Sequence, residues 1–390
     1  MFIAATEMDS LLPYCISKIL IPLLLVGLIA SVAFADEVVI KKGNKEITLQ
    51  GEILEEAQDK SILFQKSNGE LLILTADQIK SKVESSAKVP PQSKEEVAGQ
   101  LLKELPAGFK VRATTNYVIA YQTEDAYAQW IARLYEKRLV PEFEKFAKRK
   151  LKTELGDAPF PMVVIVFRTQ AEYVAHIKRT LGIDLGNTPA YYNQMSNHIV
   201  MYDLTRNFLA GDIEDRPLNE ILSRRDAIPM VATIIHEATH QLMHNRGLQT
   251  RMTDRPLWIS EGLALFFEAP NLENKNGWLR PGLVHYDRLA MFRNFLNTAR
   301  QPNSIESLIG TDARFHGENS LQAYAESWAL VHFLVRKSPK KMAAYLKDTA
   351  SRPVCVEVDA PQRIAEFKKY FGDNLEKLDR QFLKYVKNLK

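Results

Sequence analysis

The chain has 390 residues, of which 46% are hydrophobic and 25% are charged. This length allows two or three domains, and this apolar content is enough for a sizeable buried core, so a disordered chain is excluded. The formal net charge of +4 is mild, and lysine and arginine alternate with acidic residues along the chain. A nucleic-acid partner is therefore not expected.

Residues 1–35 have the pattern of a secretory signal peptide. Ile19–Ala30 is almost wholly apolar, and the small residues up to Ala35 form a cleavage signal. Two alternatives stay open: Met8 is the true start, or residues 11–34 remain as an uncleaved anchor, because they could nearly span a bilayer. We expect an exported protein, in the periplasm, at the cell surface or secreted, with no membrane contact beyond this leader.

Cysteine usage is sparse, with only Cys15 and Cys355 in the whole chain. Cys15 lies within the leader, so removal of the leader leaves a single cysteine. We therefore expect no internal disulfide and a fold held by its core alone.

Residues 36–80 predict a small all-β, SH3-like module. Short alternating or apolar runs are separated by turns, including the strong hairpin pattern Asn68-Gly69. Such a module either binds a partner, such as a cell-wall component or a protein ligand, or is a spacer or lid packed on the rest of the protein. The expected strands are residues 37–40, 46–54, 61–65 and 71–74.

Residues 81–100 are polar and interrupted by Pro90-Pro91, which indicates a linker with a helix starting near Ser93. From residue 101 the apolar pattern alternates between strand and helix periods, which predicts an α+β domain with a mixed small sheet over residues 101–247 and a mainly helical part over 248–390. Expected strands are 111–121, 162–167, 191–194 and 198–202, and expected helices are 124–151, 169–181, 286–298, 322–336, 339–349 and 363–388.

Residues 236–240 carry the H-E-x-x-H pattern of zinc sites, with His236, Glu237 and His240 on one predicted helix. Histidines four apart are turned only about 40° from each other on a helix, so both rings can reach one metal ion. A catalytic zinc site has three protein ligands and one position for water, and Glu261 is our candidate for the third ligand. Glu237 would then act as general base on the bound water.

The surrounding pattern supports a cleft-lining helix. Val231, Ile234 and Leu242 belong to an apolar stripe at helical spacing, and the two histidines lie on the other side of the helix. The alternative is a surface helix that happens to carry histidines.

The segment from Trp258 to Glu268, reading W-I-S-E-G-L-A-L-F-F-E, follows the histidine motif by seventeen residues. Together the two blocks resemble the gluzincin metallopeptidases, most closely the aminopeptidase-N-like arrangement of H-E-x-x-H followed by W-x-x-E-G-x-A. The resemblance implies a zincin-like catalytic domain over roughly residues 101–390, with one zinc ion held by His236, His240 and Glu261 and with Glu237 as base.

The sequence differs from the metzincins and also from the true aminopeptidases. Metzincins need glycine and histidine where this chain has Met243 and Arg246. No G-A-M-E-N-like element that would hold a free amine is found, which favours an endopeptidase over an aminopeptidase.

Three further site residues or segments are expected on weaker grounds. The block around Tyr324 resembles the helix that brings a tyrosine hydroxyl to the scissile carbonyl, although a buried core tyrosine is as plausible. Glu268 could accept a hydrogen bond from a ligand imidazole, or simply end its helix. The strand of His198, Ile199, Val200, Met201 and Tyr202 is assigned as the cleft edge that pairs with a peptide substrate, against an ordinary hairpin.

The function expected from these patterns is an exported zinc-dependent endopeptidase that hydrolyses peptide bonds with a Glu237-activated water. Two alternatives remain: a catalytically silent metal protein that acts through the β module, and a zinc amidase on cell-wall material. The presence of Glu237 argues against the first, because a structural zinc site is closed by four ligands and needs no base.

Overall fold

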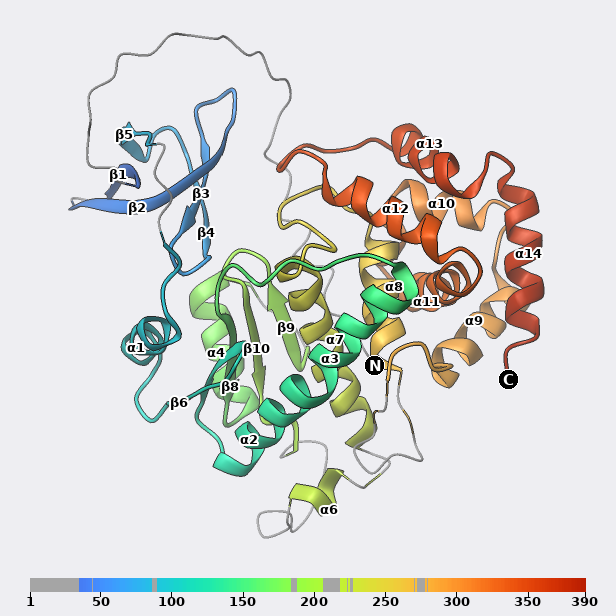
Figure 1. The fold of residues 1–390 in the computed structure, drawn as a ribbon, viewed down its shortest axis with the longest axis horizontal. Coiled ribbons are helices and arrows are strands. Elements are labelled where there is room, and N and C mark those ends of the chain that lie inside the picture. The colour runs from blue at the N-terminus through green and yellow to red at the C-terminus, as the bar shows by residue number, and fades with distance from the viewer. Residues whose placement is uncertain are drawn as a thin grey trace.

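The computed structural model describes residues 35–43, 45–85, 90–183, 188–205, 218–222, 224, 227–269, 271, 278 and 280–390. The predicted leader and most of the connection between residues 204 and 225 lie outside these residues. None of the helices in the described ranges is both long and apolar enough to cross a bilayer. The fold is mixed α+β, with an N-terminal antiparallel sheet, a second sheet and a C-terminal helical region (Figure 1).

The N-terminal β module is a five-stranded antiparallel sheet in the order β4-β3-β2-β1-β5. Val38, Ile62, Phe64 and Leu74 form its own small core on one face. The four expected strands are present, and a fifth, at residues 79–83, was not predicted. The strands are β1 (Asp36–Lys42), β2 (Lys45–Glu56), β3 (Ile62–Lys66), β4 (Leu71–Leu74) and β5 (Ile79–Val83).

The second sheet has the order β6-β7-β8-β10-β9. Its three inner strands, β7, β8 and β10, are parallel, and the edge strands β6 and β9 are antiparallel to their neighbours. The predicted strand 111–121 is in fact the β6–β7 hairpin. The strands are β6 (Lys110–Ala113), β7 (Tyr117–Tyr121), β8 (Met162–Phe167), β9 (Ala190–Asn193) and β10 (His198–Tyr202).

This strand order corrects the assignment of the substrate-pairing strand to His198–Tyr202. These residues form β10, which is hydrogen-bonded to β8 on one side and to β9 on the other. A strand with both edges occupied has no free backbone groups for a peptide. The edge position belongs to β9, the strand before it in the chain.

Helices of the first half of the chain pack on the second sheet. The capping box of Ser93 and Glu96 starts α1 where the sequence predicted. The predicted helix 124–151 is continuous, but π-helical turns at residues 135–139 and 147–151 follow α2 and α3. These helices are α1 (Lys94–Glu104), α2 (Asp125–Leu134), α3 (Val140–Phe146) and α4 (Gln170–Leu181).

The C-terminal part is helical and lies on one side of the sheet, in yellow to red in Figure 1. One buried core runs from the second sheet through α7 and α8 to α14. The expected helix 363–388 is divided at Gly372 into α13 and α14. The helices are α6 (Leu218–Leu222), α7 (Ile228–Asn245), α8 (Leu257–Glu268), α9 (Tyr286–Thr298), α10 (Ser304–Gly310), α11 (Ser320–Lys337), α12 (Pro339–Ala350), α13 (Ala360–Phe371) and α14 (Leu375–Lys387).

Candidate metal centre

Helix α7 carries the two histidines and is fixed to the sheet by its other face. Its apolar stripe, including Ile234, is buried as the pattern indicated. The side-chain amide of Gln241 also donates hydrogen bonds to two backbone carbonyls, that of Val163 in β8 at 3.1 Å and that of Asn197 beside β10 at 2.7 Å. These contacts hold the helix against rotation, so the histidine face points away from the sheet.

Helix α8 brings Glu261 to the two rings. The Nε2 atoms of His236 and His240 lie 3.1 Å apart. The carboxylate of Glu261 lies 3.2 Å from the first Nε2 and 3.4 Å from the second. All three side chains are buried, and they form the one group of metal-ligand type found among the described residues.

The size of this triangle fits a divalent metal ion. Zinc bonds to histidine nitrogen and carboxylate oxygen are about 2.0–2.2 Å long, which places tetrahedral ligand atoms about 3.3 Å apart. The two Nε2 atoms lie 3.1 Å apart, and Glu261 approaches one with Oε2 at 3.2 Å and the other with Oε1 at 3.4 Å, which are separations of this size. The His236/His240/Glu261 cluster could therefore hold a metal ion. Its donors, two imidazole nitrogens and a carboxylate oxygen, suit zinc.

The second nitrogen of each ring has a partner that leaves Nε2 bare for a metal. His236 Nδ1 lies 2.6 Å from Glu268 and donates its proton to that carboxylate. His240 Nδ1 lies 3.4 Å from the hydroxyl of Ser260, the residue before Glu261, which is a much weaker contact. Orientation of this kind by an outer carboxylate is typical of metal-binding histidines.

The charges of the cluster are strongly coupled. Burial disfavours ionisation of Glu261 and Glu268, but the adjacent imidazoles outweigh it and hold the pKa of both carboxyls well below the usual range. Burial likewise lowers the pKa of His236, but Glu268 and Glu261 more than offset this and raise it well above its usual value. Two carboxylates thus stabilise positive charge at this point.

Glu237 lies beside the cluster and is held by the edge strand. Its Oε2 accepts a hydrogen bond of 2.8 Å from the backbone N–H of Tyr192 in β9. Burial raises the pKa of the Glu237 carboxyl, a change that the nearby imidazoles partly oppose. A carboxylate with a raised pKa and a fixed position is suited to accept and return a proton.

A small cavity of about 40 Å³ opens onto these groups. Tyr324, on α11, lines it, and only 6% of this residue is exposed. Two other histidines of the C-terminal part lie elsewhere: His316 is exposed and lines another cavity, and His332 is buried and hydrogen-bonded to Tyr385. The cavity is lined by Thr188, Pro189, Ala190, Thr233, His236, Glu237, Glu261, Glu268, Arg288 and Tyr324.

Arg288 is a residue of this site that the sequence did not indicate, and it contacts Glu268 together with His285. His285 Nε2 lies 3.1 Å from Glu268 Oε1, and the guanidinium of Arg288 lies 4.0 Å from the same oxygen. They are three residues apart at the start of α9, so both face one side of it. That spacing is the sequence pattern that could have indicated a shared role for the two residues. Nothing in the sequence, however, shows that the start of α9 lies next to the end of α8.

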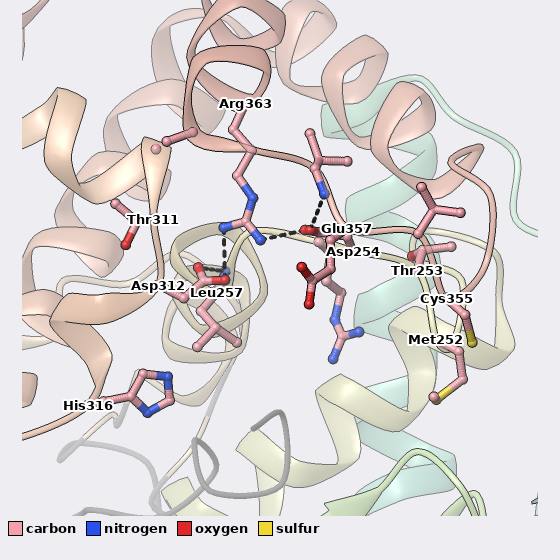
Figure 2. A pocket seen from close by; sticks show the side chains of 15 residues that line it. Met252, Thr253, Asp254, Leu257, Thr311, Asp312, His316, Cys355, Glu357 and Arg363 are labelled. Carbon is pink, nitrogen blue, oxygen red and sulfur yellow. Dashed lines mark hydrogen bonds and ion pairs between the residues drawn. The ribbon is translucent and has the colours of Figure 1, made fainter. Parts of the chain in front are cut away.

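A second and larger cavity, of about 340 Å³, lies at the start of α8 rather than at the metal centre. Figure 2 shows Arg363 reaching between Asp254 and Asp312, with which it forms ion pairs. Asp312 also accepts a hydrogen bond from the backbone N–H of Leu257, the first residue of α8. These charges satisfy one another and fix the position of α8, so we assign the network a structural role.

The fold and the cluster together define a mixed α+β protein with a buried two-histidine, one-carboxylate group that could hold a metal ion. A family model described as a protein of unknown function, DUF1570, matches residues 230–355. The match begins within α7 and ends after α12, so it includes the whole cluster but neither the β module nor the second sheet. No curated protein matches the chain.

Proposed function

We propose that the protein is an exported zinc-dependent peptidase of the gluzincin type, with a zincin-like catalytic domain, and that it acts as an endopeptidase. The observation that carries the proposal is the triangle of His236, His240 and Glu261 atoms with the Glu237 carboxylate beside it. Three ligands suit a catalytic site, because a structural zinc site is closed by a fourth protein ligand. No fourth ligand of this kind is found within the described ranges.

When bound, zinc would acidify a water molecule and polarise the substrate carbonyl. Glu237 then takes the proton from the attacking water and passes it to the nitrogen of the leaving amine. Tyr324 lines the same cavity from the opposite helix, and its hydroxyl donates a hydrogen bond to the oxyanion of the tetrahedral intermediate. Each of these steps uses a side chain that faces one small space.

Strand β9 is the better candidate for pairing with an extended substrate. It is the edge strand beside α7, and Thr188, Pro189 and Ala190 line the cavity. Because Tyr192 gives its N–H to Glu237, the backbone groups of alternate residues on this edge point toward the metal centre. A peptide added as a further strand would be held with a carbonyl beside Glu237.

The proposal is tested with the Glu237→Gln variant. It keeps all three ligands, so we expect about one zinc ion per chain by metal analysis. Its rate of cleavage of a peptide library should fall by about two to four orders of magnitude, because the proton acceptor is lost. Glu261→Ala is the contrasting variant and should lose the metal itself.

The digest is run on the full chain with and without a chelator. Cleavage by Glu237→Gln at the rate of the parent would show that the assigned base is wrong. Full zinc content in Glu261→Ala would show that the third ligand lies elsewhere.

A further inference from the structure

Arg288 is a charged residue of the cavity for which the peptidase chemistry described above has no role. It lies in the first turn of α9 and lines the cavity together with His236, Glu237 and Glu261. Only 6% of the residue is exposed. Its guanidinium carbon is 5.9 Å from the centre of the Tyr324 ring, so the charge lies next to the proposed oxyanion donor.

The guanidinium is poorly satisfied by the protein. Among the described residues its one ion pair is with Glu268 Oε1, at the outer limit of 4.0 Å. That carboxylate is already engaged by His236 at 2.6 Å and by His285 at 3.1 Å. Besides this pair and the Tyr324 ring, the guanidinium contacts the sulfur of Met291 at 3.9 Å, which is a weak acceptor.

A buried guanidinium has five N–H donors and requires acceptors for them. Within the described ranges no oxygen atom lies at hydrogen-bonding distance from these donors. The donors that line the cavity are therefore available to a ligand. The ligand group that matches the planar fork of arginine, with two parallel hydrogen bonds, is a carboxylate.

The direction of β9 determines which half of a paired peptide lies next to the cavity. Its first residue, Ala190, lines the cavity with Arg288 and His236, whereas Tyr192 stacks on His244, two turns further along α7. A peptide that pairs antiparallel to β9 has its C-terminal half next to the beginning of β9. Because Ala190 and Arg288 line the same cavity, a carboxylate in the C-terminal half of such a peptide is the one placed to meet Arg288.

We propose that Arg288 is a specificity residue that binds a substrate carboxylate on the C-terminal side of the scissile bond. This inference rests on the proposed peptidase function and narrows its substrates to peptides with a carboxylate shortly after the cleaved bond. The carboxylate is either the free C-terminus or an acidic side chain. A free C-terminus would restrict cleavage to the end of the peptide.

The test measures binding and does not depend on turnover. Calorimetry on the zinc-loaded full chain compares an acetylated dialanine with its C-terminal amide. We expect the acid to bind about 10- to 100-fold more tightly, in line with a hydrogen-bonded charge pair. The Arg288→Gln variant should lose this preference, and Arg288→Lys, which keeps the charge but not the fork, should retain a smaller one.

The matched control is Arg293→Gln. Arg293 is on the same helix but is exposed and bonded to the carbonyl of Leu389, so its loss should leave the preference unchanged. Zinc content and circular dichroism establish that each variant is folded. If Arg288→Gln misfolds, the comparison of Arg288→Lys with the parent decides, and an undiminished preference for the acid in Arg288→Lys overturns the proposal.

Three results would overturn the proposal. The first is that the parent binds the acid and the amide equally. The second is that folded Arg288→Gln keeps the full preference for the acid, which would mean that the metal alone binds the carboxylate. The third is an equal loss of preference in Arg293→Gln. Failure to cleave any peptide would refute the proposed function but would leave the binding difference measurable.

The two sources of carboxylate are separated by C-terminally amidated peptides of equal length. One carries glutamate after the scissile position and the other carries glutamine. A preference for glutamate that depends on Arg288 identifies an acidic side chain as the source. If the glutamate and glutamine peptides bind equally, while the parent still binds the dialanine acid more tightly than its amide, the source is the free C-terminus.

Discussion

The two ligand histidines are oriented by partners of unequal strength. The His236 ring is held by a charged hydrogen bond of 2.6 Å to Glu268, whereas the His240 ring is 3.4 Å from the hydroxyl of Ser260. A bond to an ionised acceptor is worth about twice a neutral one, and the shorter distance adds to the difference. Orientation of the metal site therefore depends chiefly on Glu268.

We expect Glu268→Ala to lower zinc affinity by about 10- to 100-fold, because His236 loses the partner that fixes its tautomer. Ser260→Ala is the control at the other histidine and should have a much smaller effect. Competition with a chromogenic chelator measures both affinities. Equal affinities in Glu268→Ala and in the parent would show that Glu268 only ends its helix, the second interpretation of the sequence.

At the residue scale, the sequence predicted the part of the site that local spacing determines. The spacing of His236 and His240, and the frame around Glu261, indicated three side chains that the structure brings together. It did not indicate Arg288, nor that His285 contacts Glu268, because these contacts depend on where the start of α9 lies relative to the end of α8. The backbone N–H of Tyr192 was equally hidden, since any residue type supplies that donor.

Helices α8 and α11 approach each other closely at Gly262, the glycine that follows the proposed third ligand. A Cβ at this position would lie 2.6 Å from the side chain of Val331 and 2.7 Å from the backbone oxygen of Ser327. The absence of a side chain thus sets the distance between these helices. It also sets how Glu261 and Tyr324, one on each helix, face the same cavity.

We expect Gly262→Ala to destabilise the protein by about 1–3 kcal/mol, because the backbone of α11 has to move. In a helix without such contacts the same change stabilises by about 1 kcal/mol. Gly99→Ala in α1, where nothing lies within 4 Å of the added Cβ, is the matched control and should raise the melting temperature. Thermal unfolding of both variants tests this, and a stabilised Gly262→Ala would contradict the close approach.

Elements were predicted well where one residue pattern determines them and less well where distant segments pair. The buried run of β8 and the capped helices α1 and α4 appear close to the expected positions. The edge position was assigned to β10 and belongs to β9, because a sequence shows a hairpin but not which of its strands a third strand joins. Parallel pairing of β10 with β8 decides this, and it links segments more than thirty residues apart.

At the scale of the whole molecule, the β module packs on the part that carries the metal cluster. The backbone N–H of Leu71 donates a 2.7 Å hydrogen bond to the carbonyl of Met195, just after β9. Arg251 joins the two parts by donating to the carbonyls of Gly69 at 2.8 Å and Gln194 at 3.0 Å. These contacts agree with the second interpretation of the module, a spacer or lid packed on the rest of the protein, and do not test the binding of a partner.

An apolar cluster completes this junction and shows how the module uses both faces of its sheet. Leu74 belongs to the module's own core, whereas Leu63 and Leu71 point from the opposite face onto Met252. Side chains of a strand alternate between faces, so the two sets separate as expected. Ile73 shares the face of Leu71, but it is 46% exposed because the contact with the body ends before it.

We expect Leu71→Asp to destabilise the full chain by about 2–5 kcal/mol, because it removes a buried leucine and places a carboxylate in an apolar contact. Ile73→Asp, two residues along the same face of the same strand, should change stability by less than about 0.5 kcal/mol. Chemical denaturation of the two variants measures the difference. If the module does not pack on the rest of the protein, neither aspartate lies in that contact, and the two variants have the same free energy of unfolding. A docked module also means that Leu71→Asp raises hydrogen exchange at the amide of Met195. When the substitution separates the module from the body, the carbonyl of Met195 loses the backbone N–H of Leu71, which orders the turn after β9.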